Sequence, residues 1–175
     1  MKKICGSLLI FAALALSRAI ATTVIPPTFN ELVDQAQLIF QGTVTDVRCE
    51  WAGEGAQRRI ESVVTFQIED AIKGAPGAAY TLRMLGGTIG EETMGIAEAP
   101  TFKIGDRDIL FVENNGTQFI PLVGIMYGRY RVQSDIVAGK EIVANEAGGP
   151  VAGVTGVGAT EFKTAIRTRL ATSAH

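Results

Sequence analysis

The sequence predicts a mainly β fold, with antiparallel strands between a short N-terminal helix and a longer C-terminal helix. Two observations lead to this prediction. Apolar and polar residues alternate along residues 59–72 and again along shorter segments, as in strands with one buried face. Glycine-rich turn signals separate these segments, and apolar residues return to helical spacing near the C-terminus.

The N-terminus predicts export. Lys2 and Lys3 precede a largely apolar stretch over residues 4–16, and the small-residue pattern Ala19-Ile20-Ala21 follows. This order is that of a secretory signal peptide over residues 1–21, cleaved after Ala21. A buried N-terminal helix is the alternative, while a span of the roughly 30 Å bilayer core needs a longer run. We therefore expect a periplasmic or secreted protein with no membrane span after cleavage.

The composition limits the partners. Three of the 16 basic residues lie in the signal segment, so 13 remain against 18 acidic residues in a mature chain of 154 residues. A net charge of −5 disfavours nucleic acid, which requires a clustered basic surface. Cys49 is the single mature thiol, so no internal disulfide can form, and we expect it to be a half-buried strand residue.

The first half of the chain predicts one short helix and three strands. Thr28 and Glu31 form a capping box for the helix. The first strand, residues 38–49, shifts its apolar phase next to Gly42, which indicates a bulge or bend. The second strand covers residues 59–72, and a third covers residues 80–84. A long connection over residues 86–105 follows, and loops of this length are often functional.

The second half predicts two hairpins and a helix. A strand over residues 108–113 leads through the turn Asn114-Asn115-Gly116 into residues 117–123. Residues 126–132 alternate again, and residues 136–138 and 142–144 flank Gly139-Lys140 as an extra hairpin. The domain is thus expected to cover residues 22–145. Residues 146–175 are expected to form a Gly/Ala-rich connector and a helix with Phe162, Ile166 and Leu170 on one face.

Three segments carry a resemblance to a known family. Residues 36–47 (AQLIFQGTVTDV), residues 58–74 with their Ile72-Lys73-Gly74 ending, and residues 105–111 (GDRDILF) resemble barrel strands of the tissue inhibitors of metalloproteinases and of netrin-type modules. Residues 128–132 (GRYRV) also resemble a segment of uncharacterised secreted bacterial proteins. The resemblance implies an OB-like, five-to-six-stranded antiparallel barrel.

The chemistry of those inhibitors does not follow from the resemblance. They chelate the protease zinc through a cysteine at the mature N-terminus, whereas this mature chain is expected to begin at Thr22. The disulfide cysteines of the family are also missing from this sequence. The resemblance therefore implies a fold and leaves the activity open.

The sequence predicts no enzyme, and it offers no catalytic, metal-binding or cofactor-binding set. The single histidine is the terminal His175, so Cys49 has no predicted base, and no Cys/His set fits zinc. The carboxylate pairs Glu69-Asp70 and Glu91-Glu92 are weak candidates for acid–base work or calcium. Glu69 and Asp70 are strand neighbours and point to opposite faces, and Glu91-Glu92 is expected to be a solvated loop.

A non-enzymatic binding module for an extracytoplasmic protein is the leading hypothesis. Its contact surface would be the loops over residues 50–59 and 86–105, and the candidate partner-binding residues are Trp51, Met94, Tyr127 and Arg129. A protease inhibitor that uses a wedge without cysteine is the first alternative, and a carboxylate-based hydrolase is the second.

Overall fold

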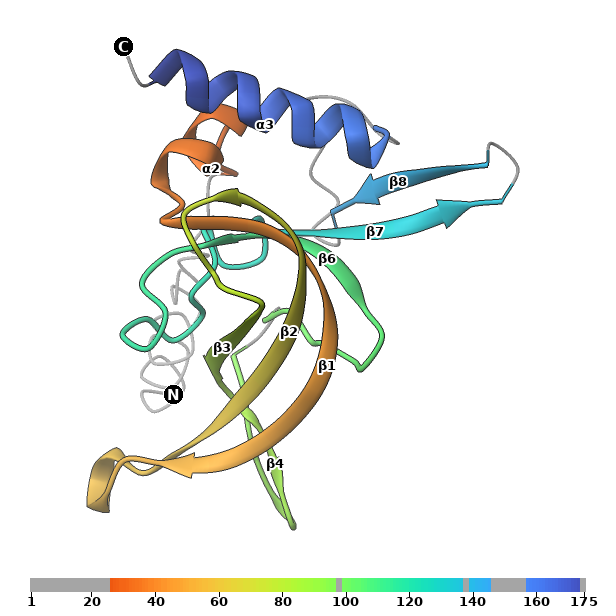
Figure 1. Cartoon of the computed structure of the whole chain (residues 1–175). Coiled ribbons are helices and arrows are strands. Elements are labelled where there is room, and N and C mark those ends of the chain that lie inside the picture. The colour runs from red at the N-terminus through yellow and green to blue at the C-terminus, as the bar shows by residue number, and fades with distance from the viewer. Residues whose placement is uncertain (1–25, 97–98, 137–138, 146–156, 174–175) are drawn as a thin grey trace, which may run out of the picture.

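The computed structural model describes residues 26–96, 99–136, 139–145 and 157–173, so the predicted signal peptide and most of the predicted connector lie outside the described residues. The fold is mainly β, as expected (Figure 1). A six-stranded antiparallel sheet has the strand order β3-β2-β1-β6-β7-β8, and β4 and β5 form a separate hairpin. The elements are α2 (Phe29–Gln35), β1 (Leu38–Ala52), β2 (Arg59–Lys73), β3 (Ala79–Leu85), β4 (Gly87–Ile89), β5 (Glu92–Met94), β6 (Arg107–Val112), β7 (Arg129–Asp135), β8 (Lys140–Ala144) and α3 (Ala159–Ser173).

The ribbon of β1 and β2 is long and strongly curved, as Figure 1 shows. The pairing of β1 with β2 shifts register at three places, one of them between Gln41 and Gly42, which confirms the predicted irregularity. A Cβ atom at Gly42 would lie 2.8 Å from the carbonyl oxygen of Gln67, so the close approach requires glycine. The curvature gives the sheet a concave face and a convex face.

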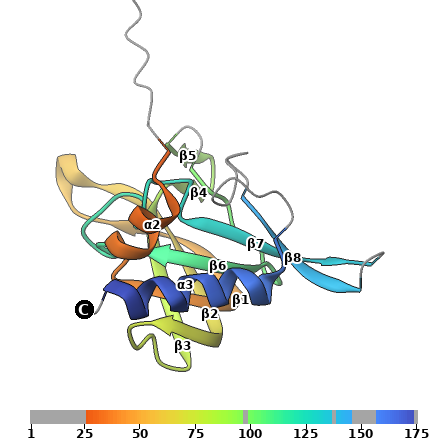
Figure 2. The same cartoon turned by 90° about the horizontal axis from the view of Figure 1, so that it is seen from above.

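Two hydrophobic clusters occupy the two faces of the sheet. Strand β6 shows the division, since Ile109 and Phe111 belong to one cluster while Leu110 and Val112 belong to the other. The first cluster lies under α2 and α3, and α3 runs roughly along the line of β6 and β7 when the sheet is viewed from above (Figure 2). The second cluster fills the concavity of the β1–β2 ribbon.

Both predicted helices are present. Thr28 caps α2, and the Thr28–Glu31 capping box forms in both directions. In α3, Phe162 and Ile166 are buried, and Leu170 packs against the same cluster. The C-terminal helix therefore shares its core with the sheet.

The sheet does not close into a barrel. The segment 113–122 follows β6 and forms no strand. Its one β-bridge joins Leu122 to Val112 at the end of β6, so the predicted strand over residues 117–123 is wrong. This segment instead forms hydrogen bonds with backbone amides on the free edge of β3. Asn115 Oδ1 accepts a hydrogen bond from the Arg83 amide at 3.1 Å, and the Phe119 carbonyl accepts one from the Leu85 amide at 2.7 Å. Residues 113–122 thus contact β3 as a loop, where the second strand of a hairpin was expected.

The extra hairpin differs in its strands from the prediction. Its first strand is β7 itself, which begins at Arg129 rather than Met126 and pairs with β8 from Arg131 to Asp135. Figure 1 shows this hairpin projecting beyond the body of the fold. The predicted strand over residues 136–138 falls largely outside the described residues.

A polar network ties four strands together beside this hairpin. Glu69 on β2 accepts hydrogen bonds from Arg107 on β6 and from Gln41 and Thr43 on β1, and Arg107 also pairs with Glu141 on β8. The Arg107 guanidinium lowers the pKa of Glu69 from its ordinary 4.5 to about 2. Since the folded state favours the ionised carboxylate, this contribution is present above pH 4.5 and is lost as the pH falls towards 2.

The variant Glu69→Gln tests this network. We expect it to lower the free energy of unfolding at neutral pH by at most about 1 kcal/mol, because the pair is partly exposed to solvent. The difference from wild type should shrink between pH 4.5 and about 2, as measured by urea unfolding at several pH values. Glu91→Gln, at the exposed turn between β4 and β5, is the control. A difference that does not depend on pH would contradict this interpretation.

Candidate binding site

A pocket of about 340 Å³ lies where the concave face of the sheet meets residues 86–96 and 99–102. None of the described residues that line it is charged. The lining residues are Val47, Ser62, Val64, Met84, Leu85, Gly86, Gly87, Thr88, Thr93, Met94, Gly95, Ile96, Ala99, Pro100, Thr101, Phe102 and Ile120. Strands β1–β3 supply the floor, and much of the loop expected to be a contact surface supplies the wall.

Two adjacent glycines allow the β4–β5 hairpin to fold onto the sheet. Gly86 and Gly87 have φ angles of 115° and 135°, in the region that favours glycine. A Cβ atom at Gly87 would lie 2.5 Å from Cys49 Sγ and 3.0 Å from Ser62 Oγ, so a larger residue would push the hairpin away. Ser62 Oγ donates a hydrogen bond to the Gly86 carbonyl at 2.7 Å. These contacts fix the hairpin against β1 and β2.

Cys49 lies beneath this hairpin. It is a half-buried residue of β1, as expected, and its Sγ atom lies 3.8 Å from Ser62 Oγ. The side chain contacts the hairpin backbone at Gly87 but does not line the pocket.

Two of the four candidate partner-binding residues, Trp51 and Met94, each adjoin Ile60, and Met94 also lines the pocket. Trp51 pairs with Ile60 across the β1–β2 ribbon, and the Ile60 amide donates a hydrogen bond to Met94 Sδ at 3.3 Å. Met94 is 37% exposed, and the Arg58 guanidinium stacks 3.7 Å from the Trp51 ring centroid. The exposed Phe119 adjoins the pocket through the hydrogen bond from Leu85 to its carbonyl.

The other two candidates do not lie on this surface. Tyr127 is half-buried and packs against the cluster under the helices. Arg129, a candidate partner-binding residue, lies in the interior, with 1% of its surface exposed. Its charge is held by Asp106 and Asp108 instead of by a partner.

The spacing of charged residues in the sequence is a signal for the interior cluster of Arg129, Asp106 and Asp108. Asp106 and Asp108 are two residues apart, as are Arg129 and Arg131, and side chains at this spacing along a strand point to the same face. Asp106 immediately precedes β6, and the other three residues lie in β6 or β7. In the register of β6 and β7, Asp108 lies opposite Arg131. The sequence therefore contained complementary charges at matching spacing, but not the information that β6 and β7 are neighbours.

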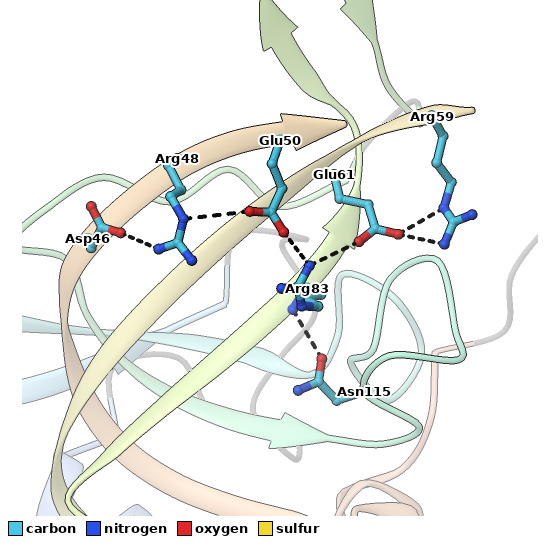
Figure 3. Close-up of polar contacts among 7 residues, drawn as sticks. All are labelled: Asp46, Arg48, Glu50, Arg59, Glu61, Arg83 and Asn115. Carbon is cyan, nitrogen blue, oxygen red and sulfur yellow. Dashed lines mark hydrogen bonds and ion pairs between the residues drawn. The ribbon is translucent and has the colours of Figure 1, made fainter. Parts of the chain in front are cut away.

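The convex face of the β1–β3 sheet carries a row of alternating charges, shown in Figure 3. Arg83 pairs with both Glu50 and Glu61, at 2.5 Å and 3.5 Å. The row continues to Arg48 and Asp46 on one side and to Arg59 on the other, and Asn115 caps the Arg83 amide. Each charge in the row has an opposite neighbour and the row has no net charge, so we do not assign a charged ligand to this face.

The predicted carboxylate pairs do not form a shared site. Glu69 bonds to Arg107, whereas its neighbour Asp70 pairs with Lys163 and Arg167 of α3. Glu91 and Glu92 are exposed on the β4–β5 hairpin. Within the described ranges, no group of three or more His, Cys, Asp or Glu side chains is arranged to hold a metal ion.

Comparison with protein-family models, with curated proteins and with solved structures finds no match to this chain. In the part of the chain that the structure describes, no helix is long and apolar enough to cross a membrane.

Proposed function

We propose that this chain is an exported, non-enzymatic binding module, and that its pocket receives an apolar group of a partner protein. The observation that carries the proposal is the pocket of about 340 Å³, whose described lining has no charged side chain. Such a lining favours an uncharged occupant, because a charged group would lose its hydration without gaining an ionic partner.

The size of the pocket supports this use. An apolar cavity of about 150 Å³ holds one benzene molecule, and ligand pockets in proteins begin near 300 Å³. The pocket at 340 Å³ can therefore take a large side chain together with part of its neighbour. Burial of apolar surface contributes roughly 25 cal/mol per Å² to such binding.

The rim supports a protein partner rather than a small molecule. Met94 and Phe119 are 37% and 62% exposed, and Trp51 pairs with Ile60, whose amide donates to Met94 Sδ. Exposed aromatic and methionine side chains around a concave site are typical of protein interfaces. A ligand that covers this rim as well as the pocket must be larger than the pocket.

The family resemblance bears only on the fold. We interpret the sheet as an open relative of the OB-like barrel, supported by the long, bent β1, which pairs with β2 on one edge and β6 on the other. The alternative function of a protease inhibitor would use the same surface, with the β4–β5 hairpin as its wedge, and the identity of the partner distinguishes the two.

Site-specific photocrosslinking tests the proposal. A benzophenone amino acid replaces Met94 at the rim, and the same residue at Thr81, which is exposed on the far face of β3, is the control. We expect a crosslinked protein from the exported fraction at position 94 and none at 81, and the purified partner should rebind. Ala99→Trp, which fills the pocket, should abolish rebinding, whereas Ala79→Trp at an exposed site should not.

Two results would contradict the proposal. One is an equal crosslink from both positions, which would indicate random contact. The other is rebinding of the purified partner to a folded Ala99→Trp variant with unchanged affinity, which would show that the pocket is not used. Recovery of a protease at position 94, with loss of its activity on binding, would instead support the inhibitor alternative.

A further inference from the structure

A cluster of charged side chains, Arg129, Asp106 and Asp108, contacts the wall of the pocket, and we call it the charge centre. Arg129 of β7 is 1% exposed, and Asp108 of β6 is fully buried. Arg129 Nε and Nη2 donate to the two carboxylate oxygens of Asp108 at 2.9 Å and 3.0 Å, and Nη2 also donates to Asp106 Oδ2 at 2.9 Å. This bidentate geometry fixes the plane of the guanidinium.

The same guanidinium contacts the wall of the pocket. Its Nη1 donates to the Thr101 carbonyl at 2.5 Å, and its central carbon lies 4.0 Å from the centroid of the Phe102 ring. Thr101 and Phe102 both line the pocket. One face of the Phe102 ring therefore lies against a cation whose own position is set by Asp108.

The charge centre also fixes the residues after Phe102. Asp106 Oδ2 accepts a hydrogen bond from the Lys103 amide at 2.9 Å as well as from Arg129. The Gly105 amide donates to the Val44 carbonyl at 2.9 Å, which ties the same turn to β1. The wall segment is thus attached to the sheet through Thr101, Lys103 and Gly105.

We propose that Arg129 is a positioning residue for the pocket: through Thr101 and Phe102 it sets the shape of the wall against which the partner's apolar group packs. The inference rests on the proposed binding function. Arginine suits this role because its planar fork can bond to a carboxylate and a carbonyl while it stacks on a ring, which lysine cannot do. A buried ion pair adds little stability over apolar residues of similar size, so stability alone does not account for it.

The variant Arg129→Lys tests the proposal, with Phe162→Leu as a matched control that disturbs the core under the helices, away from the pocket. Two quantities are measured on the full chain. The first is the exchange rate of the Lys103 and Gly105 amides in the absence of any ligand. The second is the Kd for N-phenyl-1-naphthylamine, an uncharged aromatic probe whose fluorescence rises in apolar sites.

We expect Arg129→Lys to speed both amide exchange rates and to raise the probe Kd, each by about tenfold, because charge-assisted hydrogen bonds to the wall are lost. Phe162→Leu should leave both quantities unchanged. Wild-type values in a folded Arg129→Lys variant would overturn the proposal. If that variant does not fold, Phe102→Leu takes its place, and unchanged exchange and probe affinity there would overturn it equally.

The two quantities separate this proposal from the proposed function. If wild type binds no probe but Arg129→Lys still speeds exchange at Lys103 and Gly105, the pocket is not a binding site while the positioning role stands. If wild type binds the probe and Arg129→Lys changes neither quantity, the binding function stands and the positioning role fails.

Discussion

Replacing Asp108 with alanine is expected to lower the free energy of unfolding by about 3–5 kcal/mol, because it leaves a buried guanidinium without its main carboxylate partner. Asp108 is fully buried and bonds twice to Arg129, which is 1% exposed. Asp106 does not replace the lost bidentate pair. Its side chain is 17% exposed to solvent, and its contact with the guanidinium is through Arg129 Nη2. Urea unfolding followed by circular dichroism measures the change.

A double variant separates the cost of removing one partner of the buried ion pair from the net value of the pair. Asp108→Leu combined with Arg129→Met removes both charges, and most of the lost stability should return, since apolar residues of similar volume replace buried ion pairs at little cost. A loss below about 1 kcal/mol for Asp108→Ala alone would contradict the assignment of a desolvated pair.

Phe162→Ala is expected to have the second large effect, a loss of about 3–5 kcal/mol, typical of a buried aromatic side chain replaced by alanine. The Phe162 ring centroid lies 4.8 Å from that of Tyr130, 5.9 Å from that of Phe29 and 6.1 Å from that of Phe111. It therefore joins α3 to α2, β6 and β7 at one point.

Leu170→Ala on the same helix is the control, because Leu170 is partly exposed and should cost clearly less. Thermal or urea unfolding of the two variants decides the comparison. Equal losses for Phe162→Ala and Leu170→Ala would show that α3 is held by its whole apolar face and not mainly by Phe162.

The sequence was sufficient to predict the local structure where local chemistry decides it. The capping box of Thr28 and Glu31 predicts the start of α2, and the spacing of Phe162, Ile166 and Leu170 predicts the buried face of α3. The phase change at Gly42 predicts the irregularity in β1. Each of these signals lies within about ten residues, which is the range over which sequence patterns are informative.

The features that the sequence did not predict depend on contacts between residues far apart in the sequence. The turn signal at Asn114-Asn115-Gly116 is real, but whether the next residues form a strand depends on β3, whose edge they satisfy through Asn115 and Phe119. Alternation on β7 correctly predicts that Arg129 and Tyr130 point to opposite faces of the strand. It cannot show that the face with Arg129 is buried and pairs with Asp106 and Asp108. The pocket likewise depends on the packing of residues 86–96 and 99–102 against the sheet.

Methionine-methyl NMR tests the central claim, that the pocket takes up an apolar group, most directly. Met84 and Met94 line the pocket, whereas Met126, in the turn before β7, does not. During titration with N-phenyl-1-naphthylamine, we expect the methyl signals of Met84 and Met94 to shift with one common Kd while the Met126 signal stays in place. Unmoved Met84 and Met94 signals, or an equal shift of all three, would contradict the claim.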